Sequence, residues 1–266
     1  MQTTKSFISS LLFLVVFSAC QKEELTNWSP AENLLHGEEL LMDIFIQSQY
    51  LNEGYNTYYQ DNCAALHSDS NNEFTLVYDF NSNCNFPNNG RPRFASLNIL
   101  KNQPTQYNHR TVLMVEYYEL NNYIFSGKVN IDIAEEQDMK VYHISTENVH
   151  IKHKNNESFA WSCQQKITWK QGSHTTYFLN GNTAFDDDIY HVEGYSTYTS
   201  HDGKTYTATI ITPIEKNTSC RWIQRGVMSL DLGEKDKQML DFGDGVCNNL
   251  VLISVDRWNK AIHTLQ

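Results

Sequence analysis

The chain has 266 residues, of which 20 are basic and 31 acidic, giving a formal net charge of −11. Nucleic acids and anionic membrane surfaces are bound through clustered lysine and arginine, so this charge argues against either as a partner of the folded body. Hydrophobic residues make up 40% of the chain and aromatic residues 12%. That is enough for a folded core and too much for a disordered chain.

The N-terminus has the pattern of an export signal. Lys5 precedes an apolar run over residues 7–17, which ends in Ser18 and Ala19 before Cys20. A membrane-spanning helix needs ~20 apolar residues, so this run is closer in length to the hydrophobic region of a signal peptide. We expect cleavage between Ala19 and Cys20. The chain that remains has a formal net charge of −12, because Lys5 is the only charged residue removed.

Two short motifs at this point resemble those of bacterial lipoproteins. The run Phe17-Ser18-Ala19-Cys20 resembles the lipobox, which implies acylation of the Cys20 thiol and anchoring in a membrane by acyl chains. The alternative is an ordinary secretory signal that carries a cysteine at its end. The following Gln21-Lys22-Glu23-Glu24 resembles the acidic export signal of surface lipoproteins of the Bacteroidota. It implies an outer-membrane location facing the outside of the cell, and the alternative is a solvated tether.

One helix is expected after the tether. Ser29 is a suitable cap, Pro30 favours the first turn, and Glu32 completes the start signal. Leu34, Leu41 and Phe45 share one face of such a helix, which predicts packing on the rest of the protein. The resulting division is a signal peptide over 1–19, a lipidated tether over 20–30, helix and loop over 31–73, and a β-rich body over 74–266, with two sub-halves in that body as an alternative.

The body has the alternation of half-buried strands. Val129, Ile131 and Ile133 alternate with polar residues, and the same period recurs from Val149 to His153. Asn121-Asn122 predicts one hairpin turn, and Asp202-Gly203 predicts a second, of type I′. The fold class expected is all-β, either an antiparallel β-sandwich or a strongly twisted antiparallel sheet, with one short N-terminal helix.

Five cysteines follow Cys20, and export to an oxidising compartment makes disulfides plausible. No two of them form a Cys-x-x-Cys pair, which argues against structural zinc. We expect the disulfides Cys63–Cys84 and Cys220–Cys247, with Cys163 free and buried. The choice depends on local pairing and on an internal similarity between residues 76–84 and 239–247, each a strand that ends in Asp-Phe before a turn and a cysteine.

These segments carry a resemblance to a family. The order Asp79-Phe80 to Cys84, Gly90-Arg91, Ile167-Thr168-Trp169, Gly203 to Tyr206, Cys220-Arg221-Trp222 and Asp241 to Cys247 resembles uncharacterised lipoproteins of the Bacteroidota. It spans roughly residues 74–256. Asn81 and Asn83 depart from it, because glycines usually occupy that turn. The resemblance implies an exported β-rich lipoprotein and no particular activity.

Candidate chemistry is sparse, and no motif for a cofactor occurs. Asp186 and Asp188, in a run of three aspartates before His191, could bind calcium or form an acid–base pair, although a polar hairpin tip is the preferred interpretation, because it requires nothing beyond solubility. His143 and His153 should share one face of a strand and His150 the other, which argues against a metal site there.

The expected function is a non-enzymatic binding or structural role in the cell envelope, with a glycan or protein as a possible ligand. Fifteen tyrosines and five tryptophans could provide stacking platforms for sugars, although tyrosine also suits half-buried strands. The alternative is a glycan-acting hydrolase that uses Asp186 or Asp188 in a cleft.

Overall fold

The computed structural model describes residues 27–52, 64–68, 73–78, 93–103, 109–155, 157–175, 187–233, 237–255 and 260–265. They form one helix and thirteen strands. The helix is α1 (Ser29–Asn52). The strands are β1 (Ala64–Ser68), β2 (Glu73–Tyr78), β3 (Arg93–Gln103), β4 (His109–Leu120), β5 (Tyr123–Glu136), β6 (Met139–His153), β7 (Ser158–Gln171), β8 (Ile189–Thr199), β9 (Thr205–Asn217), β10 (Arg225–Asp231), β11 (Lys237–Asp244), β12 (Leu250–Ser254) and β13 (Lys260–Thr264).

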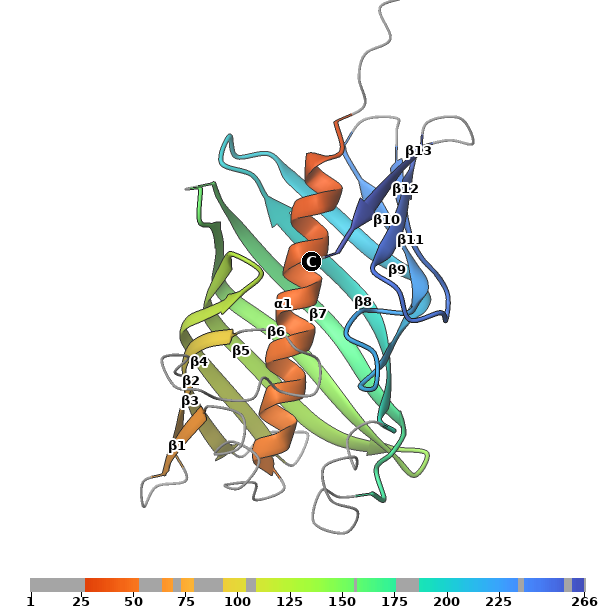
Figure 1. Ribbon diagram of the computed structural model, residues 1–266. Coiled ribbons are helices and arrows are strands. Elements are labelled where there is room, and N and C mark those ends of the chain that lie inside the picture. Colours follow the sequence, from red (N-terminus) through yellow and green to blue (C-terminus); the bar gives the residue numbers. More distant parts are fainter. Residues whose placement is uncertain are drawn as a thin grey trace, which may run out of the picture.

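The strands form a single sheet in which each strand pairs antiparallel with the next along the chain. The sheet is strongly curved, and α1 lies across its concave face (Figure 1). The expectation of an all-β antiparallel fold with one N-terminal helix is therefore confirmed. Of the two arrangements that the sequence left open, the structure has the single twisted sheet.

The helix is buried on every side. All residues from 34 to 49 are buried, including the apolar side chains named above and polar ones such as His36, Glu38 and Asp43. The predicted apolar face therefore packs on the sheet, but the opposite face is covered as well. An interior strand and the last strand both contribute to this cover, because His36 stacks on Tyr123 of β5 and also contacts His263 of β13.

The helix begins at Ser29, where the sequence predicts its start, but the side chain that accepts a hydrogen bond from the backbone there belongs to Asn27 and not to Ser29. The amide N–H of Glu32 donates to the carbonyl of Trp28, and the side-chain oxygen of Asn27 accepts from the amide of Ser29. Further along, a Cβ on Gly37 would lie 2.4 Å from Nε1 of Trp161. Glycine is unfavourable in a helix interior, so its presence here reflects the close approach of that indole. Among the described residues, no helix has the length and apolar character needed to cross a membrane.

Bulges give the sheet the curvature that wraps it around α1. The strand register shifts between Ser126 and Lys128, between Ser145 and Val149, and between Val192 and Tyr195. An extra residue on one strand bends it and increases its twist. Gly194 lies in one of these bulges with a φ of +121°, and a Cβ there would lie 2.3 Å from the carbonyl oxygen of Gln164. No other residue type fits this position without strain.

The hairpin turns follow their predicted chemistry in one case and depart from it in another. Asn121 and Asn122 have φ values of 53° and 67°, as a type I′ turn requires, which confirms that turn. In the β8–β9 connection only Gly203 has a positive φ. The amide of Gly203 donates to the carbonyl of Ser200, so the loop is longer than the two-residue type I′ turn that we expected.

The region 31–73, which we expected to contain only helix and loop, also contains a strand. The helix continues to Asn52, and β1 covers Ala64–Ser68. The backbone of β1 pairs with β2 from Ala64 opposite Tyr78 to Ser68 opposite Phe74. Its sequence, Ala-Ala-Leu-His-Ser, contains no β-branched residue, so pairing with the neighbouring strand rather than intrinsic propensity makes it a strand.

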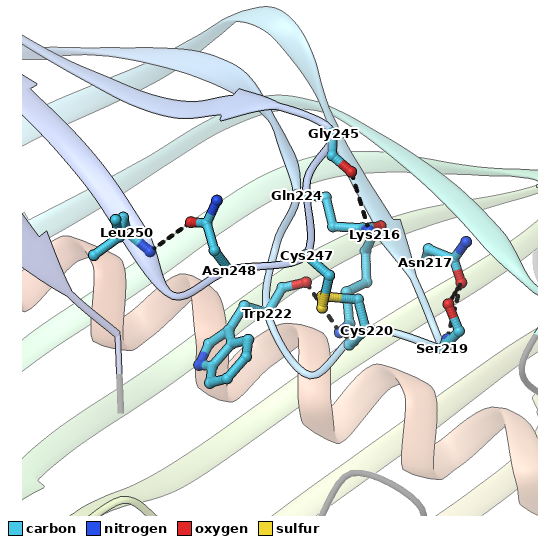
Figure 2. Close-up of a disulfide and its surroundings, with 10 residues drawn as sticks. All are labelled: Lys216, Asn217, Ser219, Cys220, Trp222, Gln224, Gly245, Cys247, Asn248 and Leu250. Atoms are coloured by element: carbon cyan, nitrogen blue, oxygen red, sulfur yellow. Dashed lines mark hydrogen bonds between the residues drawn. A yellow bond between two sulfur atoms is a disulfide. The ribbon is translucent and has the colours of Figure 1, made fainter.

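One of the two expected disulfides is confirmed. Cys220 and Cys247 are bonded, with their Cα atoms 5.7 Å apart, and they join the β9–β10 loop to the β11–β12 loop (Figure 2). The amide of Gly245 donates to the carbonyl of Gln224, which adds a second link between these loops. Cys163 is free and buried, as expected. Cys63 and Cys84 lie outside the described residues.

Removing the disulfide should destabilise the protein without changing its fold. The bond closes a loop with a sequence separation of 27. Its loss in the Cys220→Ser/Cys247→Ser variant should lower the unfolding free energy by about 3 kcal/mol, because the unfolded chain regains entropy. Urea titration measures this change, with the parent protein as reference. Non-reducing peptide mapping of the parent should yield a peptide joining Cys220 to Cys247, and a peptide joining Cys163 to either would contradict the assignment.

Candidate functional site

Acidic side chains on α1 are hydrogen-bonded into the sheet. Glu38 accepts hydrogen bonds from Oγ of Ser196 on β8 and from Nε2 of Gln165 on β7, the latter at 2.7 Å. Burial raises the pKa of Glu38, and the two hydrogen bonds oppose that rise in part. Asp43 accepts from the hydroxyl of Tyr118 on β4 at 2.6 Å. Both carboxyl groups are sealed from solvent, so they position the helix rather than meet a solute.

Histidines from three elements meet near the first half of the helix. The ring of His36 stacks on Tyr123 with centroids 3.8 Å apart, and Tyr123 contacts His153 at 4.7 Å. Burial of His36, together with the nearby His263 and His153, lowers its pKa from 6.5 to about 3. His36 is therefore neutral at neutral pH. Within the described ranges, no group of three or more His, Cys, Asp or Glu side chains is arranged to hold a metal ion.

The predicted faces of the β6 histidines are wrong. His143 pairs with Lys166 and lines a hollow on the outer side of the sheet, whereas the ring of His153 contacts Tyr123 on the inner side. The cause is the bulge between Ser145 and Val149, where Asn148 has a φ of 52°. A residue inserted into one strand shifts every later side chain to the opposite face.

The acidic run lies partly in the core. The carboxylate of Asp188 accepts from Nε1 of Trp169 at 3.1 Å and from the hydroxyl of Tyr190 at 3.4 Å. Its backbone carbonyl accepts from the amide of Thr218. Asp188 is 3% exposed and links β7, β8 and the residue that follows β9. Asp187 accepts from the hydroxyl of Thr175, and Asp186 lies outside the described residues.

A hollow of about 590 Å³ on the outer side of β5–β8 is the best candidate for a binding site. Tyr195 is 40% exposed at its edge, and Gly194 lies beside it, where the backbone of Gln164 approaches too closely for a side chain. The other outward side chains that line it are Asp132, His143, Ser145, Gln164, Lys166 and Glu193. The β8 bulge that bends the sheet therefore also shapes this hollow.

Ion pairs occupy one side of the hollow. The guanidinium of Arg110 donates to both carboxylate oxygens of Asp132, at 2.7 and 2.6 Å. Nζ of Lys166 donates to Glu136 at 2.6 Å, and the same carboxylate lies 3.4 Å from Nε2 of His143. Bonding to Lys166 lowers the pKa of Glu136. These charges neutralise one another, so the hollow does not present a field of one sign.

The other side of the hollow has unused hydrogen-bonding capacity. Gln164, Glu193 and Tyr195 form no side-chain hydrogen bond with any part of the chain that the structure describes. An exposed aromatic ring with free polar groups around it can bind a solute by packing and hydrogen bonding together.

The sequence analysis did not identify these residues. One signal was present, because alternation in residues 195–199 and 205–209 places Tyr195 and five threonines on one face of two strands. Gln164 and the charged neighbours join them only through the register of β7 with β8 and of β6 with β7.

Comparison of the chain with models of protein families, with curated proteins and with solved structures finds no match. The resemblance to lipoproteins of the Bacteroidota therefore stays a prediction from the sequence motifs.

Low pH should destabilise the protein through His36. Its pKa is about 3 in the folded chain and 6.5 in the unfolded chain, so below pH 6.5 only the unfolded state takes up this proton. The unfolding free energy should then fall by up to roughly 1.4 kcal/mol per pH unit as pH decreases from 6.5 toward 3. Glu38 has the opposite sign, because its raised pKa adds stability as pH falls through the folded value. Comparing variants therefore separates the contribution of His36 to the pH dependence of stability from that of Glu38.

The test is the His36→Phe variant, which keeps a ring against Tyr123 but does not titrate. Urea titrations at a series of pH values should show a shallower loss of stability in His36→Phe than in the parent. His150→Phe is the matched control, since His150 is exposed on the outer face, and it should follow the parent. A pH dependence that is the same in His36→Phe and the parent would contradict the assignment.

Proposed function

We propose that the chain is a lipoprotein of the outer membrane, held by acyl chains on Cys20 and exposed at the cell surface. Its β body acts as a non-enzymatic binding module of the cell envelope. The observation that carries this proposal is that the segment following the cysteine becomes the core of the fold. Ser29, the start of α1, is the ninth residue after Cys20.

The contacts at the start of α1 support an anchored module. Nε2 of Gln238 on β11 donates to the carbonyl of Asn27 at 2.8 Å, and Nδ2 of Asn33 donates to the hydroxyl of Tyr198 on β8 at 3.1 Å. A chain of nine residues spans at most about 30 Å. An anchor at Cys20 would therefore hold this end of the sheet close to the bilayer.

The interior arrangement favours binding on the outside of the sheet. The helix fills the concave face (Figure 1), and its carboxylates Glu38 and Asp43 accept hydrogen bonds from the strands around it. The outward hollow at Tyr195 is the candidate contact surface. The alternative of a glycan hydrolase gains no support from Asp188, whose carboxylate is buried against Trp169 and Tyr190.

Labelled palmitate should enter the parent protein and not the Cys20→Ser variant. The thiol of Cys20 is the acylation site in this proposal, and serine cannot form the thioether. Cells that express each form are labelled, and the protein is recovered and its label counted. Cys163→Ser is a control that keeps Cys20. Labelling that persists in Cys20→Ser would contradict the anchor.

Replacing Lys22, Glu23 and Glu24 with alanine should leave the protein membrane-bound but hide it from protease added to intact cells. Charges next to the acylated cysteine lie at the headgroups, where an export system can recognise them. Immunoblotting after protease treatment measures the accessible fraction. Substituting Asn27 with alanine changes the tether outside this tetrapeptide and serves as the control. Equal accessibility in the triple variant and the parent would show that the stretch is a tether only.

A further inference from the structure

The outer side of β7–β10 carries a face without charged residues, which we name the hydroxyl face. The strand register arranges its side chains in three rows. Gln164, Tyr195, Thr209 and Ser229 form one row across four strands; Ser162, Thr197 and Thr207 form the next; Ala160, Thr199 and Thr205 form the third. All ten are at least partly exposed. In a chain with 51 charged residues, an outer face of ten residues with no charge needs a reason.

Charged residues begin at the borders of this face. The row next to Gln164 and Tyr195 contains Lys166 opposite Glu193. At the other border, the row of Ser162, Thr197 and Thr207 continues to Asp231 on β10, which lies opposite Lys237 on β11. Neighbouring strands lie about 4.8 Å apart and alternate residues of one strand about 6.7 Å apart, so the face presents a regular grid of polar groups.

The hydroxyl groups of the grid are only partly used within the protein. Ser162 and Thr197 share a hydrogen bond at 2.5 Å, and Thr199 and Thr205 share one at 2.9 Å. The side chains of Thr207, Thr209 and Ser229 have no hydrogen-bond partner in the described ranges, and the same holds for the side chains of Gln164 and Tyr195. Each hydroxyl group can donate once and accept twice, so the face can exchange many hydrogen bonds with a ligand.

An exposed aromatic ring lies in the first row. Tyr195 is 40% exposed and lies between Gln164 and Thr209, at the edge of the hollow of about 590 Å³. Ile211, 59% exposed, lies two residues beyond Thr209 on the same face of β9. The face therefore combines a flat apolar surface with hydroxyl and amide groups.

We infer that the hydroxyl face binds an uncharged polysaccharide, with a sugar ring packed on Tyr195. Sugars present a C–H face to aromatic rings and hydroxyl groups to polar side chains, which is the combination found here. The net charge of −11 disfavours an anionic polymer, and the face has no cluster of acids that would select a cationic one. This inference deepens the binding role proposed above by naming a ligand class and a surface.

A second copy of this chain fits the face less well. Stable protein interfaces have an apolar, aromatic core. Of the large side chains on and beside this face, only Tyr195 and Ile211 could supply it. The hydroxyl groups would need partners on the facing copy to avoid being buried unpaired. A dimer through this face is therefore an outcome that the experiment must detect.

The experiment is electrophoresis of the full folded protein in native gels that contain a dissolved polysaccharide. Dextran, galactomannan and hydroxyethyl cellulose serve as uncharged probes, and polygalacturonate as an anionic one. At least one uncharged polymer should retard the parent protein, and Tyr195→Ala should bind that polymer roughly tenfold more weakly because the stacking platform is lost. Gln164→Ala should weaken binding as well.

The matched control is Tyr117→Ala, which removes a tyrosine of similar exposure on β4, away from the hydroxyl face. It should bind like the parent, and thermal melting should show that Tyr195→Ala is folded. Equal loss in both tyrosine variants would overturn the inference, as would retardation by polygalacturonate alone or by no polymer. A concentration-dependent dimer that Tyr195→Ala dissociates would assign the face to a second copy instead. Palmitate labelling tests the anchor separately, since binding in the gel does not require acylation.

Discussion

The structure depends on the complete burial of one helix inside a curved sheet. Because α1 carries apolar and polar side chains on all sides, the sheet must both enclose it and satisfy it. Glu38 is bonded by Ser196 and Gln165, and Asp43 by Tyr118, so β4, β7 and β8 each have a required register. Removing one partner of a buried charge typically costs several kcal/mol of unfolding free energy. These contacts therefore stabilise the fold and also disfavour other strand registers. The bulges provide the curvature that such an enclosure needs, since an extra residue bends a strand toward the helix.

The same enclosure leaves the outer side of the sheet as the surface for the proposed binding role. With the concave face occupied, the surfaces open to a ligand on the described residues are those on the outer side, such as the hollow at Tyr195. Gly194 links the two roles. Its positive φ allows the bulge in β8, and its missing side chain lets the backbone of Gln164 approach closely beside Tyr195. A substitution at Gly194 would therefore change both the curvature and the candidate site, whereas Tyr195 can be changed without disturbing the core.

The last strands complete the cover of the helix. The ring of His263 on β13 lies against His36, and its Nδ1 lies 3.5 Å from Oε1 of Glu32. The last strand of the chain therefore contacts the helix that precedes the first strand. The disulfide between Cys220 and Cys247 joins the loops that precede β10 and β12 (Figure 2). It restrains the part of the sheet that closes over the start of the helix. In the proposed lipoprotein this is the end of the body nearest the anchor, where tension from the tether would act.

Features encoded within a few residues could be predicted from the sequence. The start of α1 near Ser29, the Asn121-Asn122 turn and the antiparallel strands are of this kind, because caps, turns and alternation depend on neighbours in the chain. The bond between Cys220 and Cys247 was also predicted, from turns at strand ends. The lipid anchor at Cys20 stays a prediction from the sequence. Only the tertiary structure decided the inner position of His153, the burial of Asp188 and the position of Gln164 beside Tyr195. Each depends on a bulge or a strand register, which is set by contacts between residues far apart in the chain.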